Sequence, residues 1–98
     1  MTAAYNNLAL AYLSLEEVER AQKLLERAIE LNPEYAFAWL NLAGLHVQAH
    51  DPEAARACLR VVAAIQGLSA RDMAHMLAIE AQLALQEERF EDAESYLT

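Results

Sequence analysis

The sequence contains few residues that interrupt helices or form disulfides. Its 98 residues include two glycines, two prolines and one cysteine, Cys58. A lone cysteine cannot form a disulfide within the chain, so a hydrophobic core must hold the fold. We expect Cys58 to be a small buried hydrophobe in a reducing compartment. Because Ala, Leu and Glu dominate the rest of the sequence, the composition favours helix along the whole chain.

Basic residues are few, and their distribution is uneven. Fifteen Asp and Glu residues outnumber seven Lys and Arg residues, which gives a formal net charge of −8. Nucleic acid and anionic membranes need a positive protein surface, so neither is expected as a partner. Six of the acids lie between Glu80 and Glu94, with Arg89 as the one base among them. This run indicates a solvated helix face, and a site for a basic partner is the alternative.

Long hydrophobic runs are absent. The longest uncharged stretch, residues 35–50, contains two His, an Asn and a Gln, and it is too short and too polar to cross a bilayer. No signal peptide is recognisable, so we expect a cytoplasmic location, with a targeting signal upstream of Met1 left open. At this length we expect a single domain over residues 1–98.

The dominant feature of the sequence is an internal repeat. Eight positions recur at one fixed spacing with size and polarity mostly kept: Tyr5, Asn7, Leu8, Ala9, Tyr12, Ala21, Leu25 and Ala28 recur as Trp39, Asn41, Leu42, Ala43, His46, Ala55, Leu59 and Val62. A fixed period of about 34 residues is typical of a solenoid, a stack of similar supersecondary units. One unit cannot bury its apolar face alone, so neighbouring units must share a continuous core.

Start and stop signals divide the chain into helices. Asn32-Pro33 ends one helix, because the residue before a proline is pushed out of helical geometry. Asp51-Pro52 starts another, with an Asp cap and a proline at the first helical position. Gly67 stops that helix, and Ser69 with Asp72 caps the next. The signals predict about six helices, over residues 2–14, 18–31, 35–49, 52–66, 69–86 and 89–98.

The period slips in the last part of the chain. Phe90, Ala93 and Leu97 repeat the pattern four positions later than the period predicts. The four extra residues are close to one helical turn of about 3.6 residues, so we expect a longer fifth helix with the same face inward. A stripe formed by Leu77 and the two preceding methionines predicts core packing, with an adaptable binding surface as the alternative.

These residues resemble the tetratricopeptide repeat family. Its pattern is Trp, two residues, Leu-Gly, two residues and Tyr, followed by a small Ala, an aromatic or Leu, another Ala and a closing Pro. The first unit supplies Tyr5, Leu8, Ala9, Tyr12, Ala21, Leu25, Ala28 and Pro33, and the second supplies Trp39, Leu42, Ala43, His46, Ala55, Leu59 and Val62. The second unit departs at His46 and Val62 and lacks the closing Pro, and the third is degenerate.

The resemblance implies an all-α fold, a right-handed α-solenoid of antiparallel helix pairs with three units at about residues 2–35, 36–69 and 70–98. It also implies that the first helix of each pair lines a concave surface. Helical spacing places these candidate partner-binding residues there: Asn6, Asn7, Leu10, Leu13, Phe37, Leu40, Asn41, Gly44, Val47, Gln48, Arg71, His75, Ala78 and Gln82. An apolar wall with a few amides suits an amphipathic or extended peptide better than a phosphate or a metal.

Individual residues of this surface leave alternatives open. Asn7 and Asn41 recur in register, which fits recognition of a peptide backbone or hydrogen bonds between helices. Gly44 lies inside a predicted helix at a cost of about 1 kcal/mol, so a neighbouring helix or a bound chain is expected close to it. One subgroup of the family clamps the carboxylate tail of chaperones. That clamp is disfavoured here, because Asn6 and Leu10 stand where it has Lys and Asn.

The sequence contains no constellation that supports catalysis. His46 and His50 have a spacing that can bind a metal, but His46 occupies a packing position and no acid or cysteine is placed to complete the shell. Phosphate loops, nucleophile elbows and Cys/His clusters are absent. We therefore expect no enzymatic activity, no metal or other cofactor and no small-molecule substrate.

The leading functional hypothesis is a non-catalytic protein–protein interaction module, a scaffold that binds a peptide or a helix in the concave groove. The alternative is a structural segment of a longer or self-associating array that acts through its exposed ends. In that alternative the last helix forms a homo-oligomer through Tyr96 and Leu97, because no following helix covers these apolar residues.

Overall fold

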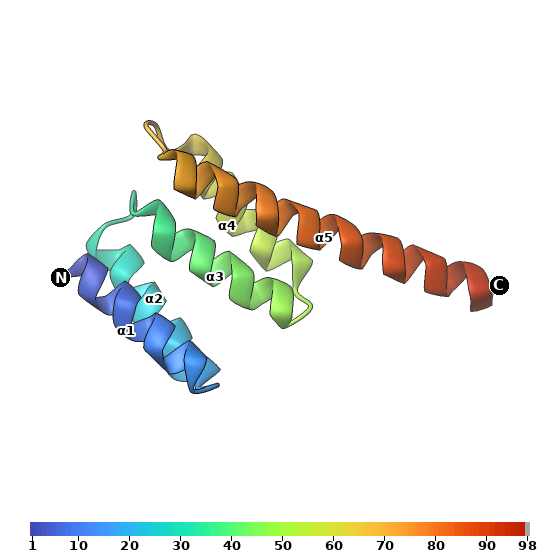
Figure 1. Ribbon diagram of the computed structural model, residues 1–98, viewed down its shortest axis with the longest axis horizontal. Helices are drawn as coiled ribbons and strands as arrows, with labels where there is room; N and C mark the ends of the chain where they lie inside the picture. Colours follow the sequence, from blue (N-terminus) through green and yellow to red (C-terminus); the bar gives the residue numbers. More distant parts are fainter. Residues whose placement is uncertain (98) are drawn as a thin grey trace.

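The computed structural model describes the backbone of residues 1–97 and the side chains of residues 1–89. All regular structure in this part of the chain is helical (Figure 1), with α1 (Thr2–Ser14), α2 (Val18–Leu31), α3 (Ala36–Gln48), α4 (Pro52–Ala64) and α5 (Ala70–Leu97). The predicted all-α class is confirmed. The first four helices begin and end within two residues of their predicted bounds.

The turns inside the first two helix pairs have the same structure. Glu16 and His50, which occupy equivalent positions of the two units, both adopt a positive φ, of 62° and 58°. The N–H of Glu17 donates to the carbonyl of Tyr12 at 2.9 Å, and the second turn has the equivalent bond from Asp51. A positive φ outside glycine costs about 1–3 kcal/mol. The packing within each helix pair must therefore hold these turns.

Start and stop signals in the sequence set several helix ends. Oδ1 of Asp51 accepts a hydrogen bond from the N–H of Ala54 at 3.2 Å, with a proline as the first helical residue of α4. Oγ of Ser69 accepts one from the N–H of Asp72 at 3.0 Å, at the start of α5. Gly67, between these helices, adopts a φ of 74°. The predicted caps of α4 and α5 are therefore confirmed.

Small residues let the helices of the first two pairs approach closely. Ala9 and Ala21 in the first pair, and Ala43 and Ala55 in the second, have no exposed surface. Larger side chains such as Leu25 fill the space around them and are equally buried. A larger residue at any of the four alanines would overpack the contact.

The last helix differs from the prediction. The sequence predicted a fifth helix to about Gln86 and a sixth from Arg89, whereas α5 runs unbroken for 28 residues. The expected number of about six helices is therefore wrong, and residues 1–97 form five. Residues 86–89 (Gln-Glu-Glu-Arg) all favour helix, so no local signal ends α5 there. None of the helices in the described chain combines the length and the apolar character that crossing a membrane needs.

Two antiparallel pairs and the long α5 give the molecule an elongated shape (Figure 1). α2 packs against α3, and α5 packs along α3 and α4 before it runs beyond their ends. The radius of gyration is 14.5 Å, against about 13 Å for a compact chain of 100 residues. The C-terminal part of α5 accounts for much of the difference.

Candidate partner-binding surface

The residues predicted for the concave surface lie on α1, α3 and α5. α3 contacts α1 through an asparagine pair and α5 through an aromatic cluster. Leu40 and Val47 are buried in the core, so they cannot contact a partner in this conformation. The half-buried members are Leu10, Leu13, Phe37, Asn41, Gly44 and His75, and the exposed members are Asn7, Gln48, Arg71, Ala78 and Gln82.

An asparagine pair joins α1 to α3. Nδ2 of Asn41 donates to Oδ1 of Asn6 at 2.9 Å, and Asn6 has no exposed surface. Asn41 thus makes a hydrogen bond between helices, one of the two alternatives that its recurrence left open. Nδ2 of Asn6 has no hydrogen-bond partner among the described atoms. Asn7, the residue in register with Asn41, is exposed and available to a partner.

A cluster of aromatic and cationic groups joins the first turns of α3 and α5. The guanidinium carbon of Arg71 lies 4.7 Å from the ring centroid of Phe37. The ring of His75 meets the same phenyl group edge to face, with 6.2 Å between centroids, and the ring of Tyr35 also meets it edge to face, at 6.4 Å. A guanidinium stacked by its face keeps its N–H edges available for a carboxylate.

The histidine of this cluster is held neutral. Burial lowers the pKa of His75 below its ordinary value of 6.5, and the positive charge of Arg71 lowers it further, while Asp72 opposes the shift. Desolvation disfavours the charged form of a base, so the imidazole at neutral pH offers one donor and one acceptor. His75 is therefore suited to hydrogen bonding and not to attracting an anion.

Equivalent positions on α3 and α5 form rows across the surface. These helices run in the same direction along each other (Figure 1), so residues one repeat apart lie at the same level. Counted one repeat apart, the paired positions are Phe37 with Arg71, Asn41 with His75, Gly44 with Ala78, and Gln48 with Gln82, and the first pair is in contact. Residues with hydrogen-bonding side chains therefore precede and follow Gly44 along α3 and Ala78 along α5.

The sequence left two explanations for Gly44, a neighbouring helix close to it or a bound chain. No atom of the described chain outside its own helical backbone lies within 4 Å of the position that a Cβ would take there. The structure therefore excludes the first explanation within the described chain, and a bound chain remains a prediction. Its missing side chain leaves an open notch in the middle of the surface.

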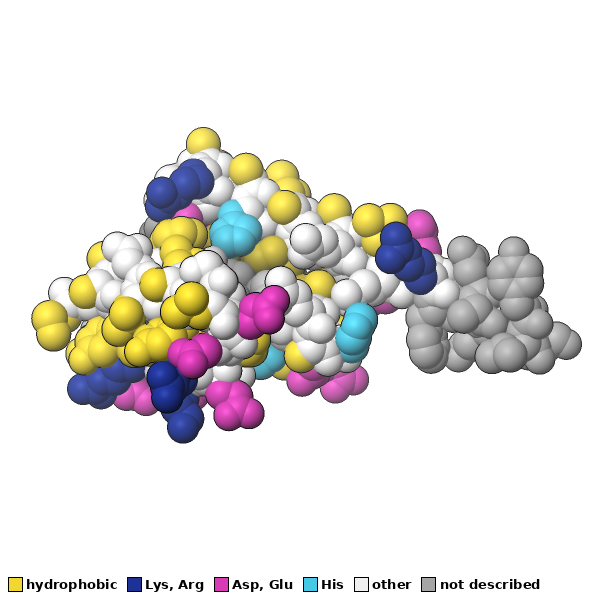
Figure 2. All heavy atoms as spheres, turned by 60° about the horizontal axis from the view of Figure 1, so that its bottom comes forward, with side chains coloured by type: hydrophobic (Ala, Val, Ile, Leu, Met, Phe, Trp, Pro, Cys, Tyr) yellow, Lys and Arg dark blue, Asp and Glu magenta, His cyan; other side chains and the backbone are white. Residues whose placement is uncertain are grey.

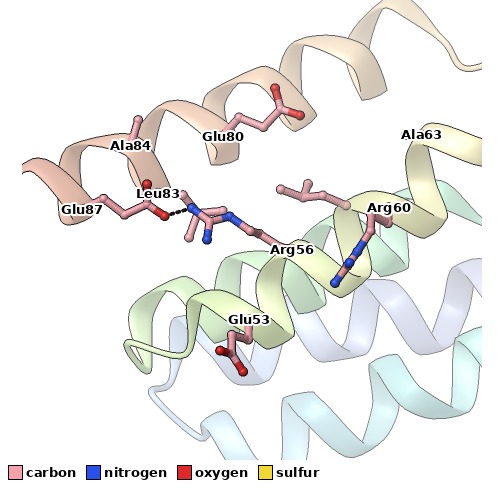
Figure 3. Close-up of a pocket in the computed structure, with 9 residues that line it drawn as sticks. Glu53, Arg56, Arg60, Ala63, Glu80, Leu83, Ala84 and Glu87 are labelled. Carbon is pink, nitrogen blue, oxygen red and sulfur yellow. Dashed lines mark ion pairs between the residues drawn. The ribbon is translucent and has the colours of Figure 1, made fainter.

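A second hollow lies between α4 and α5, away from the predicted residues (Figure 3). Its volume is about 670 Å³, and it is lined by Glu53, Arg56, Leu59, Arg60, Ala63, Glu80, Leu83, Ala84 and Glu87. Arg56 and Glu87 form an ion pair that ties the two helices together. Sequence reasoning treated the acids of α5 as a solvated face and missed this hollow. A signal was present, because Arg56 and Arg60 lie four apart and Glu80 and Glu87 seven apart, as on single helix faces.

The outer side of α5 carries exposed apolar residues. Leu77, Leu85 and Met73 expose 60%, 53% and 45% of their surface. Figure 2 shows hydrophobic side chains along this helix up to its grey end. Core packing was predicted for the stripe that ends at Leu77, but only Met76 of that stripe packs against the core. The prediction is therefore wrong for Met73 and Leu77.

Cys58 is buried, as the sequence predicted, and burial raises the pKa of its thiol. A thiol of this kind is chemically inert, because the thiolate is the reactive form. Among the described residues, no three His, Cys, Asp or Glu side chains come together in a way that could hold a metal ion. The polar chemistry of the surface is therefore that of amides, one imidazole and one guanidinium.

Comparison with known proteins identifies the repeat. The family model described as tetratricopeptide repeat matches residues 12–80, which is more than half of the chain. The match includes α2, α3 and α4 entirely and continues into α5. The chain has no match among the curated proteins or among the solved structures. On the strength of the family match and the helix pairs, the chain belongs to the tetratricopeptide repeat family.

Proposed function

We propose that the protein is a non-catalytic interaction module that holds a peptide or a helix of another protein on the concave surface of α1, α3 and α5. Repeats of this family generally mediate protein–protein interaction, through extended concave surfaces. The proposal takes the units as a right-handed solenoid in which these three helices line the groove. The partner is a protein, and the groove carries no catalytic or cofactor-binding group.

The open notch at Gly44 is the observation that carries the proposal. An apolar side chain of a partner can enter it, because no described atom lies within 4 Å of the Cβ position. The exposed amides of Gln48 and Gln82, about one helical turn after Gly44 and Ala78, can bond the backbone of an extended peptide. Arg71, at the start of α5, can donate hydrogen bonds to a carboxylate of the partner.

Filling the notch tests the proposal. Because no neighbouring atom lies within 4 Å of the Cβ position, Gly44→Leu should fold normally. Peptides selected from a random library against the unmodified protein are the probe, and fluorescence anisotropy measures their affinity. We expect Gly44→Leu to weaken their binding by about tenfold or more, which corresponds to about 1.4 kcal/mol.

The matched control is Ala57→Leu, which enlarges an exposed residue of α4, outside the predicted surface. This variant should keep the affinity of the unmodified protein, and circular dichroism should show equal helicity for both variants. Equal affinity of Gly44→Leu and Ala57→Leu for the selected peptides would contradict binding at the notch.

A second candidate function is self-association through α5. The exposed apolar residues of this helix favour it, because a contiguous apolar patch usually marks an interaction site. The side chains of Tyr96 and Leu97, which the sequence predicted as the contact, lie outside the described residues. This candidate makes the chain a segment of a larger assembly, and it leaves the groove free for a peptide.

A further inference from the structure

One face of α5 lacks the cover that the equivalent face of α3 has. α4 packs against α3, where Leu42 and Ala43 are buried. With the four-residue slip of the period included, the α3 positions of this face and their α5 counterparts are, in order, Trp39, Leu42, Ala43 and His46, and Leu77, Glu80, Ala81 and Ala84. All four α5 positions are exposed. In the described chain, the third unit therefore has the packing face of a first helix without a second helix on it.

The hollow between α4 and α5 continues this uncovered face (Figure 3). Glu80 and Ala84 belong to both, and the hollow has a volume of about 670 Å³. Leu59 of α4 and Leu83 of α5 form its apolar floor and expose only 6% and 3% of their surface. The hollow and the face together form one groove, the α4–α5 groove, which includes Arg56, Leu59, Arg60 and Ala63 of α4 and Leu77, Glu80, Ala81 and Ala84 of α5.

A small residue keeps the groove open. Ala63 occupies the position that Ile29 has in the first unit. Ile29 is half-buried and packs against the core, whereas Ala63 is exposed and lines the hollow. α2 packs closely against α3, but α5 rests mainly on α3 and meets α4 less closely. The second junction between units therefore leaves room for the side chains of another helix.

The two walls of the groove carry opposite charges. Arg56 and Arg60 lie four apart on α4, and Glu80 and Glu87 lie seven apart on α5. Arg56 and Glu87 pair with each other across the hollow (Figure 3). Arg60 and Glu80 form no ion pair among the described residues, and Glu53 adds a further acid to the lining. The lining thus has an excess of negative charge, in a chain whose net charge is −8.

We infer that the α4–α5 groove binds an amphipathic, basic helix of another protein, in the place on α5 that α4 takes on α3. A basic residue of this helix pairs with Glu80, and the groove receives its apolar stripe. A second copy of the chain fits this groove less well, because two chains of charge −8 repel each other. The site is separate from the concave surface and independent of the function proposed for it.

The contact between α3 and α4 indicates which side chains the partner helix needs. In that contact Ala43 and Ala55 are both fully buried, because small residues let the helices approach closely. Leu59, four residues after Ala55, packs into the same core. Ala81 is the counterpart of Ala43. The partner helix therefore needs a small residue over Ala81 and a large apolar residue one helical turn later.

A library of helical peptides tests the inference. Its members share the spacing of Ala55 and Leu59, vary at all other positions, and are selected against Gly44→Leu, in which the concave notch is filled. Fluorescence anisotropy then measures the affinity of the selected peptides for the unmodified protein. We expect these peptides to carry a net positive charge and to bind less tightly as salt is added, because salt screens the attraction.

Reversing one charge in the groove tests the electrostatic part. Glu80→Lys should weaken binding of the selected peptides by about fivefold or more, because an attraction becomes a repulsion. The matched control is Glu26→Lys, which makes the same charge change at an exposed position of α2. This control should keep the affinity within about twofold, since its charge lies outside the groove.

Filling the groove without a charge change tests the position of the helix. Ala84→Trp should weaken binding by about tenfold or more, because the indole occupies the space of the partner. Ala57→Trp places the same side chain at an exposed position of α4 that does not line the hollow, and should bind normally. Both alanines are exposed, so circular dichroism should show equal helicity for the two variants.

Several results would overturn the inference. They are a selection that yields no binder, selected peptides without a positive charge, and equal affinity of Ala84→Trp and Ala57→Trp. Association of the unmodified chain that the peptides displace would identify a second copy as the occupant, and would overturn it as well. Ala84→Trp should still bind the peptides selected for the concave surface, so failure at one site is distinguishable from failure at the other.

Discussion

The first two repeat units and the third share a residue pattern but differ in how the chain uses it. In the first two, the turns at Glu16 and His50 reverse the chain and bury the small residues of each helix pair. Glu88 is the counterpart of His50 once the slip of the period is included, yet it lies inside α5. Ala81, the counterpart of the buried Ala43, is exposed as a result. The repeat pattern therefore produces a buried contact only where a turn folds the second helix of the unit onto the first.

In the first two units a turn returns the second helix onto the first, whereas the third unit stays open. We expect the resulting difference in the cost of a substitution to be largest for leucines. Leu40 has no exposed surface, so Leu40→Ala should lower the free energy of unfolding by about 2–5 kcal/mol through a cavity. Leu77→Ala, on the outer side of α5, should change it by less than about 0.5 kcal/mol. Urea unfolding followed by circular dichroism measures both, and equal losses would break the distinction.

Alanines should show the same contrast through overpacking. Ala55 is fully buried in the second pair, so Ala55→Leu should lower the free energy of unfolding by about 1–3 kcal/mol. Ala81 is exposed, and Ala81→Leu has room for its side chain. Thermal unfolding at low protein concentration should give a lower midpoint for Ala55→Leu and an unchanged midpoint for Ala81→Leu. A comparable loss from Ala81→Leu would show that this face is covered.

The two glycines of the second unit, Gly44 inside α3 and Gly67 in the turn before α5, sharpen the comparison further. Gly44→Ala should raise the free energy of unfolding by about 0.5–1 kcal/mol, because alanine favours helix and nothing lies near its Cβ. Gly67→Ala should lower it, since a φ of 74° suits glycine and strains alanine. The midpoint of chemical unfolding should therefore rise for Gly44→Ala and fall for Gly67→Ala. A destabilised Gly44→Ala would mean that a part of the fold does approach this residue.

The smallest effect concerns pH and the contact between the second and third units. Because the pKa of His75 is lowered in the folded state, the unfolded chain binds its proton more tightly. Stability should therefore fall as pH drops through the ordinary value of 6.5, and this loss should end below the lowered pKa. Unfolding of the unmodified protein and of His75→Gln between neutral and mildly acidic pH isolates the effect. A steeper loss in His75→Gln would contradict the assigned direction.

Much of the fold could be predicted because it depends on local signals. The caps at Asp51 and Ser69 act within a few residues, and each lies where the sequence placed it. The period of the repeat likewise predicted the buried alanines of the first two units. The predicted stop at Gly67 is wrong, because α4 ends at Ala64 with an extended Ile65, and Gly67 turns the chain only after the helix has ended.

The course of the chain after Gln86 could not be predicted, because it depends on tertiary contacts. Leu15-Glu16-Glu17 forms a turn, whereas Glu87-Glu88-Arg89 stays helical, and neither segment contains Gly or Pro. Only packing decides between these outcomes. The same limit applies to the candidate surface, where helical spacing could not reveal that Leu40 faces the core or that Gly44 is open.

The distance between two spin labels on α5 tests most directly whether the third unit is open. Nitroxides at Ala78→Cys and Ser95→Cys, in a Cys58→Ala chain diluted with unlabelled protein, report only the distance within one chain. An unbroken helix separates these Cα atoms by about 25 Å. A chain that reversed near Glu88 would bring the two segments to about 10 Å, the spacing of packed helices. The account predicts the long distance, and a dominant short distance would contradict it.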